Sequence, residues 1–157
     1  MKNTFVIILT VLAIGLASCN KSPVQFNAAQ QALTDDNAIQ AYIKSHNLDS
    51  VKKDPSGVYY KILTPGSGAY PTKTSSIIVE YQGALLNGTI FNSETSISGS
   101  LSEFIQGWQI GIPYINAGGT ILLLIPSAYG YGDSSPGAAI PVNSVLVFNV
   151  TLVSFTN

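Results

Sequence analysis

The chain has 157 residues, 46% of them apolar, and a formal net charge of −1. This length allows one domain with a hydrophobic core and a tail, and it is too short for two full-sized domains. Seven lysines without any arginine form no basic stripe, which argues against nucleic-acid binding. Eight tyrosines and six phenylalanines supply large side chains to bury, so a folded domain is expected.

The first 18 residues are predicted to be a lipoprotein signal peptide. A short start with Lys2 precedes an apolar segment, residues 5–15, which is too short to span a bilayer comfortably. The segment ends in Leu-Ala-Ser-Cys, which resembles the lipobox of bacterial lipoproteins, where the peptide is cut before Cys19 and its thiol carries diacylglycerol. The alternative is an ordinary signal peptide with a chance cysteine. Because Cys19 is the only cysteine, no internal disulfide can form, and lipidation is its expected use.

Residues 19–56 are predicted to be a lipidated tether that contains one short helix. The stretch from residue 20 to residue 34 is polar and has no sustained apolar period, as expected of a tether. Thr34, Asp35 and Asp36 are N-cap candidates, and apolar residues follow at helical spacing over about residues 35–46. Residues 52–57, with Pro55 and Gly57, end this region and mark the domain boundary.

Residues 57–157 are predicted to form one mainly β domain. Short segments rich in Val, Ile, Tyr and Phe are separated by Gly, Pro and Asn turn signals. One expected strand covers 77–82, where Ile77, Val79 and Tyr81 alternate with Ile78, Glu80 and Gln82. Asn87-Gly88 is a hairpin signal that leads into a strand at 89–91. The other expected strands are 58–63, 120–125 and 145–154, the last with residues 146, 148, 150 and 152 on one face. Residues 105–114 are the only stretch expected to cross the sheet as a short helix.

The composition of residues 57–157 excludes several kinds of active site. This region contains no Cys and no His, because His46 lies in the upstream helix, so histidine-based nucleophilic dyads and Cys/His zinc sites are ruled out there. Its four acidic residues are dispersed and form no calcium-loop pattern. Hydrolysis by paired carboxylates stays open but has no positive support. No metal and no cofactor are therefore expected.

Five motifs in residues 57–157 are similar, in order and approximate spacing, to the FKBP family of peptidyl-prolyl isomerases. They are Val79-Glu80-Tyr81-Gln82-Gly83, Asn87-Gly88-Thr89-Ile90-Phe91-Asn92-Ser93, Phe104-Ile105-Gln106-Gly107-Trp108, Ala128-Tyr129-Gly130-Tyr131-Gly132 and the segment from Ile140 to Val150. The resemblance implies an α+β fold in which an antiparallel β-sheet curls around one short α-helix. It also implies a proline-binding pocket between the sheet and that helix, which agrees with the elements expected above.

The resemblance assigns roles to individual residues. The expected catalytic set is Tyr81, Phe91, Asn92, Ile105, Trp108, Tyr131 and Phe148, and the expected substrate-binding set is Phe104, Tyr129 and Ile140. Trp108 would be the pocket floor, with Tyr81, Phe91 and Phe148 as its walls. For Tyr81 and Phe148 a purely structural place in the core is the main alternative, because both lie on strands with alternating apolar residues.

The remaining residues would surround the mouth of the pocket. Ile105 would offer its backbone N–H to a substrate carbonyl, Tyr131 would supply a hydroxyl group at the rim, and Ile140 would close the loop side. Tyr131 lies between two glycines, which favours an exposed loop position. A structural role is the alternative for Tyr129.

Three positions depart from the family pattern. Asn92 stands where the family usually has Asp, so hydrogen-bonding capacity is kept and a charge is lost. Gly99 falls where the family places an aromatic residue, with only Ile97 nearby, so one pocket wall is expected to be missing. Phe104 replaces a small aliphatic residue, and one hypothesis is that its ring refills the space at Gly99. The departures predict a weaker or altered catalyst.

The expected activity is peptidyl-prolyl cis-trans isomerisation that assists the folding of exported proteins. Rotation about an X–Pro bond faces a barrier of roughly 18–20 kcal/mol and neither makes nor breaks a covalent bond. A desolvated aromatic pocket that favours the twisted amide therefore suffices, without nucleophile or metal. Two alternatives stay open: a catalytically weak or inactive lipoprotein that binds proline-containing segments as a chaperone, and a structural lipoprotein domain with its aromatic residues buried.

Export and lipidation of Cys19 would place the domain in the cell envelope. Asn20 is not the Asp that retains lipoproteins at the inner membrane in some bacteria, which favours the outer membrane, facing the periplasm. The expected partners are proline-containing polypeptides and, through the lipid anchor, the membrane. The family resemblance also implies binding of macrolide immunosuppressants.

Overall fold

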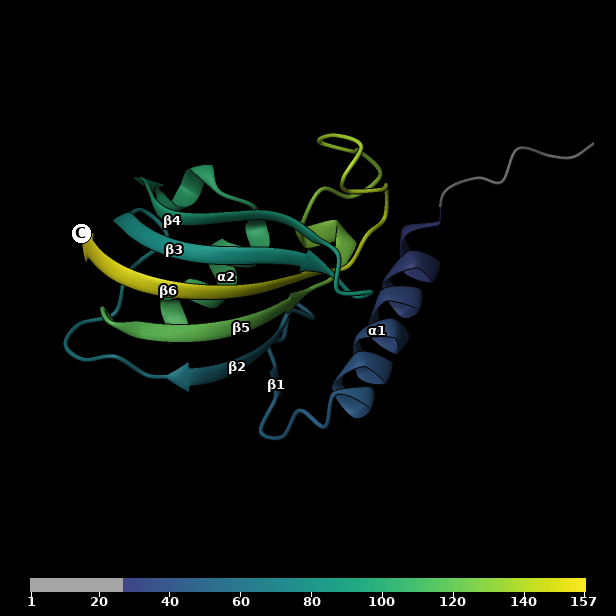
Figure 1. Cartoon of the computed structure of the whole chain (residues 1–157), viewed down its shortest axis with the longest axis horizontal. Coiled ribbons are helices and arrows are strands. Elements are labelled where there is room, and N and C mark those ends of the chain that lie inside the picture. Colours follow the sequence, from purple (N-terminus) through teal and green to yellow (C-terminus); the bar gives the residue numbers. More distant parts are fainter. Residues whose placement is uncertain (1–26) are drawn as a thin grey trace, which may run out of the picture.

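The computed structural model describes residues 27–157. The predicted signal peptide, Cys19 and the first part of the predicted tether lie outside the described residues. Within residues 27–157, six antiparallel strands form one sheet in the order β1-β2-β5-β6-β3-β4, as Figure 1 shows. The strands are β1 (Lys52–Lys53), β2 (Tyr59–Thr64), β3 (Ser76–Leu85), β4 (Ile90–Ser100), β5 (Gly119–Ile125) and β6 (Leu146–Thr156). The helices are α1 (Ala28–Ser45) and α2 (Gln106–Gly111), with short 3-10 turns at Leu101–Glu103, Ile112–Tyr114 and Ser127–Tyr129. The predicted fold, an antiparallel sheet with a short helix against it, is confirmed.

The alternation of side chains along the central strands builds the core. In β3, Ile77 and Val79 are buried, whereas Ile78 and Glu80 point away from the core and are exposed. The predicted face of β6 is also correct, and its members lie in one buried cluster with Trp108. Because successive side chains of a strand point to opposite faces, this pattern fixes which face of the sheet meets α2.

The sequence patterns predicted neither the full length of β4 nor the existence of β1. The Asn87-Gly88 turn is present, with Gly88 at φ +86°, but β4 continues to Ser100 instead of ending at residue 91. Most of the extra residues are exposed and polar, so their pairing with β3 leaves no alternating pattern in the sequence. Lys52 and Lys53, expected to be a boundary loop, pair with β2 as the edge strand β1. Backbone hydrogen bonds, rather than side-chain burial, form these edges.

The helix α2 packs unusually close to the sheet because it has glycine where it faces β5. A Cβ atom on Gly107 would lie 2.5 Å from Cγ2 of Ile125, and one on Gly111 would lie 2.3 Å from Cδ2 of Leu123. The short distance buries Trp108, which follows Gly107, so that 3% of its surface is exposed. The predicted helix, residues 105–114, is correct in place, and its last turn has 3-10 geometry.

The N-terminal helix α1 is longer than predicted. It begins at Ala28 rather than near residue 35, because Asn27 caps it by accepting a hydrogen bond from the N–H of Gln30 at 3.1 Å. The tether prediction is therefore wrong for residues 28–34. These residues are alanine, glutamine, leucine and threonine, and the alanines and glutamines favour a helix even without an apolar stripe.

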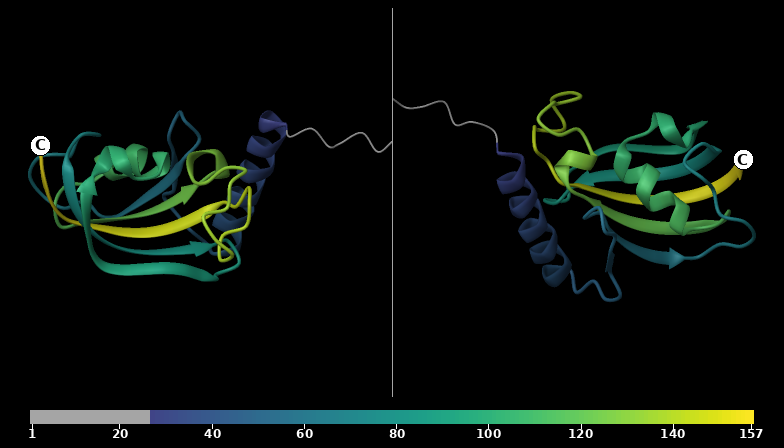
Figure 2. Two further views of the ribbon diagram at one scale, coloured as in Figure 1. Left: turned by 90° about the horizontal axis from the view of Figure 1, so that it is seen from above. Right: turned by 180° about the vertical axis from the view of Figure 1, so that it is seen from behind.

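The sheet is covered on both of its faces at one end. Leu123 and Phe148 point toward α2, while their neighbours Leu124 and Val147 pack with the fully buried Ile39 of α1. Figure 2 shows that α1 lies at the end of the strands, beside the loop that leads into β6. The helix is thus part of the folded body. None of the helices in residues 27–157 has the length and apolar character needed to cross a membrane.

Candidate functional site

A pocket of about 300 Å³ lies between the concave face of the sheet, the start of α2 and the loop before β6. Its lining combines rings from β3, β4, β6 and α2 with small residues of the loop. The lining residues are Tyr81, Phe91, Asn92, Ile97, Phe104, Ile105, Trp108, Tyr131, Pro136, Gly137, Ala139, Ile140 and Phe148. None of these side chains is acidic or basic, so the pocket offers an uncharged, largely aromatic surface.

Edge-to-face contacts fix the rings around Trp108. The ring centroid of Trp108 lies 5.0 Å from that of Tyr81 and 5.3 Å from that of Phe148, at interplanar angles of 80° and 82°. Phe91 meets Phe148 in the same way, at 5.6 Å and 79°. Such pairs are favourable beyond the area they bury, so the walls hold each other in place. The buried Nε1 of Trp108 has no hydrogen-bond partner within residues 27–157, which is unusual for a core donor.

Gly83 allows two of these rings to pack closely against the backbone of β3. A Cβ atom at this position would stand 2.6 Å from the ring of Phe91 and 2.7 Å from the ring of Phe148. Since both distances are far below van der Waals contact, only glycine fits without displacing a wall of the pocket. The match of Gly83 to a glycine of the FKBP motif therefore has a local steric reason.

The space beside Gly99 is occupied by Phe104. The ring of Phe104 lies 3.4 Å from the position of a Cβ atom on Gly99, and it stacks on Trp108 with a centroid distance of 5.2 Å and an angle of 28°. Ile97 lines the same side. The ring thus stands in the place where the sequence predicted a missing wall.

Tyr81 and Asn92 form the polar corner of the pocket. The side-chain N–H of Asn92 donates to the hydroxyl oxygen of Tyr81 at 2.8 Å. Burial, with smaller contributions from Glu94 and Tyr131, raises the pKa of Tyr81 above its usual value, so its phenol is neutral at physiological pH. The hydroxyl hydrogen of Tyr81 consequently remains available to a ligand.

The start of α2 presents a second donor. Ile105 is the N-cap residue of α2, and its carbonyl group accepts from the N–H of Trp108 at 2.9 Å. The backbone N–H of Ile105 donates to no group within residues 27–157. Gln109 fixes the segment in front of it by donating to the carbonyl of Phe104 at 2.8 Å. A carbonyl group in the pocket could therefore accept from Ile105.

The loop that closes the pocket carries Tyr131 at its rim, 36% exposed, and Ile140, which is buried. Ser135 holds the loop closed, because its hydroxyl oxygen lies 2.6 Å from the carbonyl oxygens of both Gly137 and Ile140 and shares its one hydrogen between them. Sequence reasoning did not select the other loop members at the pocket, Pro136, Gly137 and Ala139. These residues lie between two family motifs, and the only feature of the sequence that marks them is a loop that contains Pro and Gly.

Nine of the ten predicted site residues meet in this pocket, and Tyr129 is the exception. It packs against the core from the short turn at Ser127–Tyr129 and faces a different groove, which α1 borders. The alternative structural role is the one consistent with its position. Within the part of the chain that the structure describes, no group of three or more His, Cys, Asp or Glu residues is arranged to hold a metal ion.

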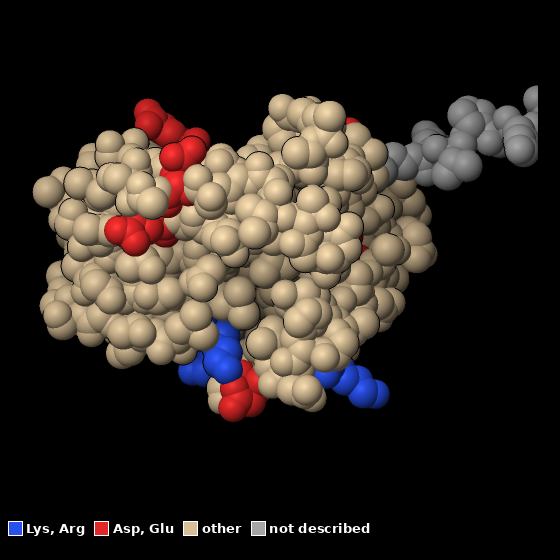
Figure 3. Space-filling view, in the orientation of Figure 1, with Lys and Arg blue, Asp and Glu red and all other residues tan. Residues whose placement is uncertain are grey.

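No acidic or basic side chain lines the pocket, although Glu94 of β4 lies near enough to Tyr81 to contribute to its raised pKa. Figure 3 shows the face of the sheet that is turned away from α2, where most acidic side chains gather toward the β3–β4 side and the lysines lie at the opposite edge beside another acidic side chain. The acidic residues of β3 and β4 are Glu80 and Glu94, and the lysines of β1 and β2 are Lys52, Lys53 and Lys61. The uncharged lining of the pocket itself best fits a neutral or apolar ligand.

Comparison with known proteins gives consistent matches. Residues 68–153 match the family described as FKBP-type peptidyl-prolyl cis-trans isomerase. A probable FKBP-type isomerase, FkpA, of Neisseria meningitidis is 39% identical over 119 residues, which are 73% of this chain and 44% of that protein. The outer membrane protein MIP of Legionella longbeachae is 38% identical over 64% of this chain and 45% of that protein. The chain spans about half the length of these curated relatives.

Solved structures share the fold over most of the chain. The crystal structure of FkpA from Escherichia coli aligns with a TM-score of 0.70 and 29% identity, covering 82% of this chain and 62% of that one. A Pseudomonas syringae peptidyl-prolyl cis-trans isomerase aligns with a TM-score of 0.69 and 27% identity, covering 84% of this chain and 98% of that one.

Proposed function

This chain belongs to the FKBP-type peptidyl-prolyl cis-trans isomerase family, and from that membership we propose that its aromatic pocket catalyses rotation about X–Pro bonds. The observation that carries the proposal is the uncharged pocket floored by Trp108, with free donors at its edge. The planar amide loses resonance when it twists, so a dry site that favours the less dipolar, twisted form lowers the barrier. No nucleophile is required.

Each side chain has a proposed part in this reaction. The proline ring would lie on Trp108 between Tyr81 and Phe148, where water is excluded. The N–H of Ile105 would donate to a carbonyl group of the substrate and fix its position, while the hydroxyl of Tyr131 would reach the substrate at the rim. Held in this way, the peptide on one side of the bond can rotate against the other. The proposed substrates are proline-containing segments of exported proteins.

A protease-coupled assay on an X-Pro peptide tests the activity. The full chain should accelerate isomerisation, and both Trp108→Ala and Tyr131→Phe should reduce kcat/KM, the former by at least tenfold because it removes the floor. Tyr70→Phe is the matched control, since Tyr70 is 58% exposed and does not line the pocket. A purified protein that leaves the rate at its uncatalysed value at micromolar concentration would rule out the enzyme.

A binding module without catalysis is the second candidate function. It is favoured by Asn92, because an amide replaces the family's usual carboxylate beside Tyr81 and lowers the polarity of that corner. The same pocket would then hold a proline-containing segment, or a macrolide, as a chaperone does. Quenching of Trp108 fluorescence by a proline peptide, together with an unchanged isomerisation rate, would select this function.

We also propose that the protein is held in the cell envelope by a lipid on Cys19 and that it faces the periplasm from the outer membrane. The lipobox-like Leu-Ala-Ser-Cys supports this proposal, as does the name outer membrane protein MIP given to the Legionella relative. Metabolic labelling with a radioactive fatty acid should mark the wild-type protein and leave Cys19→Ser unlabelled. Recovery of unlabelled wild-type protein in the soluble periplasmic fraction would contradict the anchor.

A further inference from the structure

A buried acidic residue of α1 is bonded to the loop that carries the rim of the pocket. Asp35 is 2% exposed, and its Oδ2 accepts from both the N–H and the hydroxyl of Ser127, at 2.8 and 2.7 Å. Its Oδ1 accepts from the side-chain N–H of Gln31 at 2.7 Å. A carboxyl group is costly to bury unless donors surround it, and hydrogen bonds to a charged acceptor are stronger than neutral ones. Asp35 is therefore a specific link between two elements.

Ser127 passes this link on to Tyr131. The carbonyl oxygen of Ser127 accepts from the N–H of Gly130 at 3.0 Å and from the N–H of Gly132 at 2.8 Å, the residues on either side of Tyr131. The carbonyl of Gly132 in turn accepts from the N–H of Asn143 at 2.7 Å, which ties the two ends of the loop together. Ser127 thus donates its N–H and its hydroxyl to Asp35 of α1, while its carbonyl group accepts from the backbone on both sides of Tyr131.

The turn has little freedom to compensate for a lost bond. Ser127 is 1% exposed, and a Cβ atom on Gly130 would lie 2.8 Å from Cδ1 of Leu146, so the turn packs directly on the sheet. If Asp35 no longer accepted from Ser127, two buried donors would be left without a partner. The turn would have to move toward water to satisfy them, and Tyr131 would move with it.

We propose that Asp35 is a positioning residue for the pocket, which acts through Ser127 to hold Tyr131 at the rim. The inference rests on the proposed function of the pocket and extends it to a helix outside residues 57–157. Its expected effect is on substrate binding, because the loop forms one wall of the pocket and the floor at Trp108 is held independently by α2 and the sheet. Loss of the link should raise KM more than it lowers kcat.

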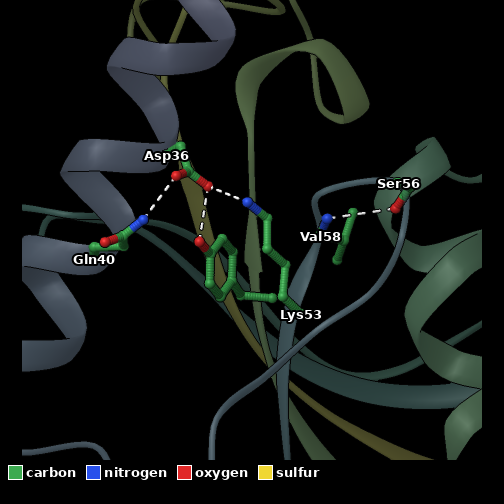
Figure 4. Close-up of polar contacts among 6 residues, drawn as sticks. Asp36, Gln40, Lys53, Ser56 and Val58 are labelled. Atoms are coloured by element: carbon green, nitrogen blue, oxygen red, sulfur yellow. Dashed lines mark hydrogen bonds and ion pairs between the residues drawn. The ribbon is translucent and has the colours of Figure 1, made fainter.

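The next residue of the same helix is a natural control. Asp36 accepts from Lys53 at 2.5 Å, Tyr59 at 2.7 Å and Gln40 at 2.7 Å. Figure 4 shows Asp36 with Lys53 and Gln40, and none of the three partners belongs to the loop. Both aspartates fasten α1 to the rest of the protein, but only Asp35 reaches Ser127. A merely structural contribution of α1 would make Asp35→Asn and Asp36→Asn behave alike.

The experiment compares full-length Asp35→Asn, Asp36→Asn and wild type below their melting temperatures. Asp35→Asn keeps the shape of the side chain but can turn an amide N–H toward the donors of Ser127. We expect its KM for an X-Pro peptide to rise roughly 2- to 30-fold, and the amides of Gly130 and Gly132 to exchange hydrogen faster. Asp36→Asn should change neither.

Two readouts separate the failure of this inference from that of the proposed function. If the wild type has no isomerase activity, the proposed function fails, and amide exchange at Gly130 and Gly132 still tests the link. Unchanged exchange in Asp35→Asn, or faster exchange with an unchanged KM in an active enzyme, overturns the positioning role. If Asp35→Asn does not fold, Ser127→Ala removes the hydroxyl donor alone and should raise KM in the same direction; an unchanged KM there overturns it.

Discussion

The ring of Phe104 takes the place of a wall that Gly99 does not provide. It lies 3.4 Å from where a Cβ atom of Gly99 would be, and it stacks on Trp108 at 5.2 Å. A side chain five positions away in the chain can fill this space because the turn at Leu101–Glu103 brings it back toward β4. The departures at Gly99 and Phe104 therefore compensate for each other, because Phe104 supplies the ring that Gly99 lacks.

This compensation predicts the behaviour of two variants. Phe104→Ala should lower kcat/KM roughly 2- to 12-fold, because an aromatic pair contributes about 0.5–1.5 kcal/mol beyond buried area. Gly99→Phe in the Phe104→Ala background should recover part of that loss, since the space is then free and Gly99 has an ordinary φ. Gly99→Phe alone should be worse than wild type because two rings would compete. Equal activity of Phe104→Ala and wild type would show that this wall is not used.

Close packing of α2 against β5 is what places Trp108. Alanine at Gly107 would push a methyl group to within 2.5 Å of Ile125. Overpacking costs about 1–3 kcal/mol, while replacing a helical glycine with alanine gains up to about 1 kcal/mol, so Gly107→Ala should lower the free energy of unfolding. We expect urea denaturation to show this loss and the isomerase assay to show a reduced kcat/KM.

Gly137→Ala provides the comparison for that variant. No atom lies within 4 Å of a Cβ at Gly137, and its φ is not in the left-handed region. Its free energy of unfolding should match wild type within about 0.5 kcal/mol. A Gly107→Ala protein as stable as Gly137→Ala would mean that α2 can shift away from the sheet without cost.

A partly buried phenol fastens the end of the α2 region to the segment before β2. The hydroxyl of Tyr114 donates to Oδ2 of Asp54 at 2.6 Å, and its ring stacks on Tyr60. The hydrogen bond to Asp54, followed by burial, raises the pKa of Tyr114 to about 12. In the unfolded chain the same group has a pKa of about 10. The folded state therefore holds this proton over a pH range in which the unfolded state has lost it.

The pH dependence of this contact follows from that difference. Its contribution is fully present below about pH 10 and is lost as the pH rises to about 12. Tyr114→Phe should thus be less stable than wild type by about 1 kcal/mol at pH 8, allowing for solvent screening, and the two should converge by pH 12. Urea denaturation at several pH values measures this, with Tyr70→Phe as the control. A difference that stays constant up to pH 12 would contradict the assignment.

The helix α1 shares a hydrophobic core with the sheet, so the two should unfold together. Ile39 is fully buried against Leu124 and Val147, and Ile39→Ala should lower the free energy of unfolding of the protein by about 2–5 kcal/mol. Leu33→Ala, on the same helix but 60% exposed, should change it by no more than about 0.5 kcal/mol. Trp108 fluorescence reports the opposite face of the sheet. An unchanged Trp108 transition in Ile39→Ala would show that α1 unfolds separately, as a tether would.

Local patterns predicted most of the sheet correctly. Alternation in β3, the Asn87-Gly88 turn and the apolar face of β6 are properties of neighbouring residues, and each is present as expected. The outer part of β4 and the edge strand β1 were missed because their pairing uses backbone groups, which every sequence has. The start of α1 was placed too late because a polar, alanine-rich turn resembles a tether until a cap and a docking surface are known.

The motifs of the sequence predicted which residues line the pocket, but they did not predict how those residues are arranged. Motif order identified Tyr81, Trp108 and Phe148 because short motifs keep their residue types. The filling of the space at Gly99 by Phe104 was a hypothesis from the motifs, and the turn between the two residues decides it. The bond between Asp35 and Ser127 depends instead on a contact between residues far apart in sequence. Such contacts are decided by packing, since the fold alone brings a carboxyl group 92 residues along the chain to its donors.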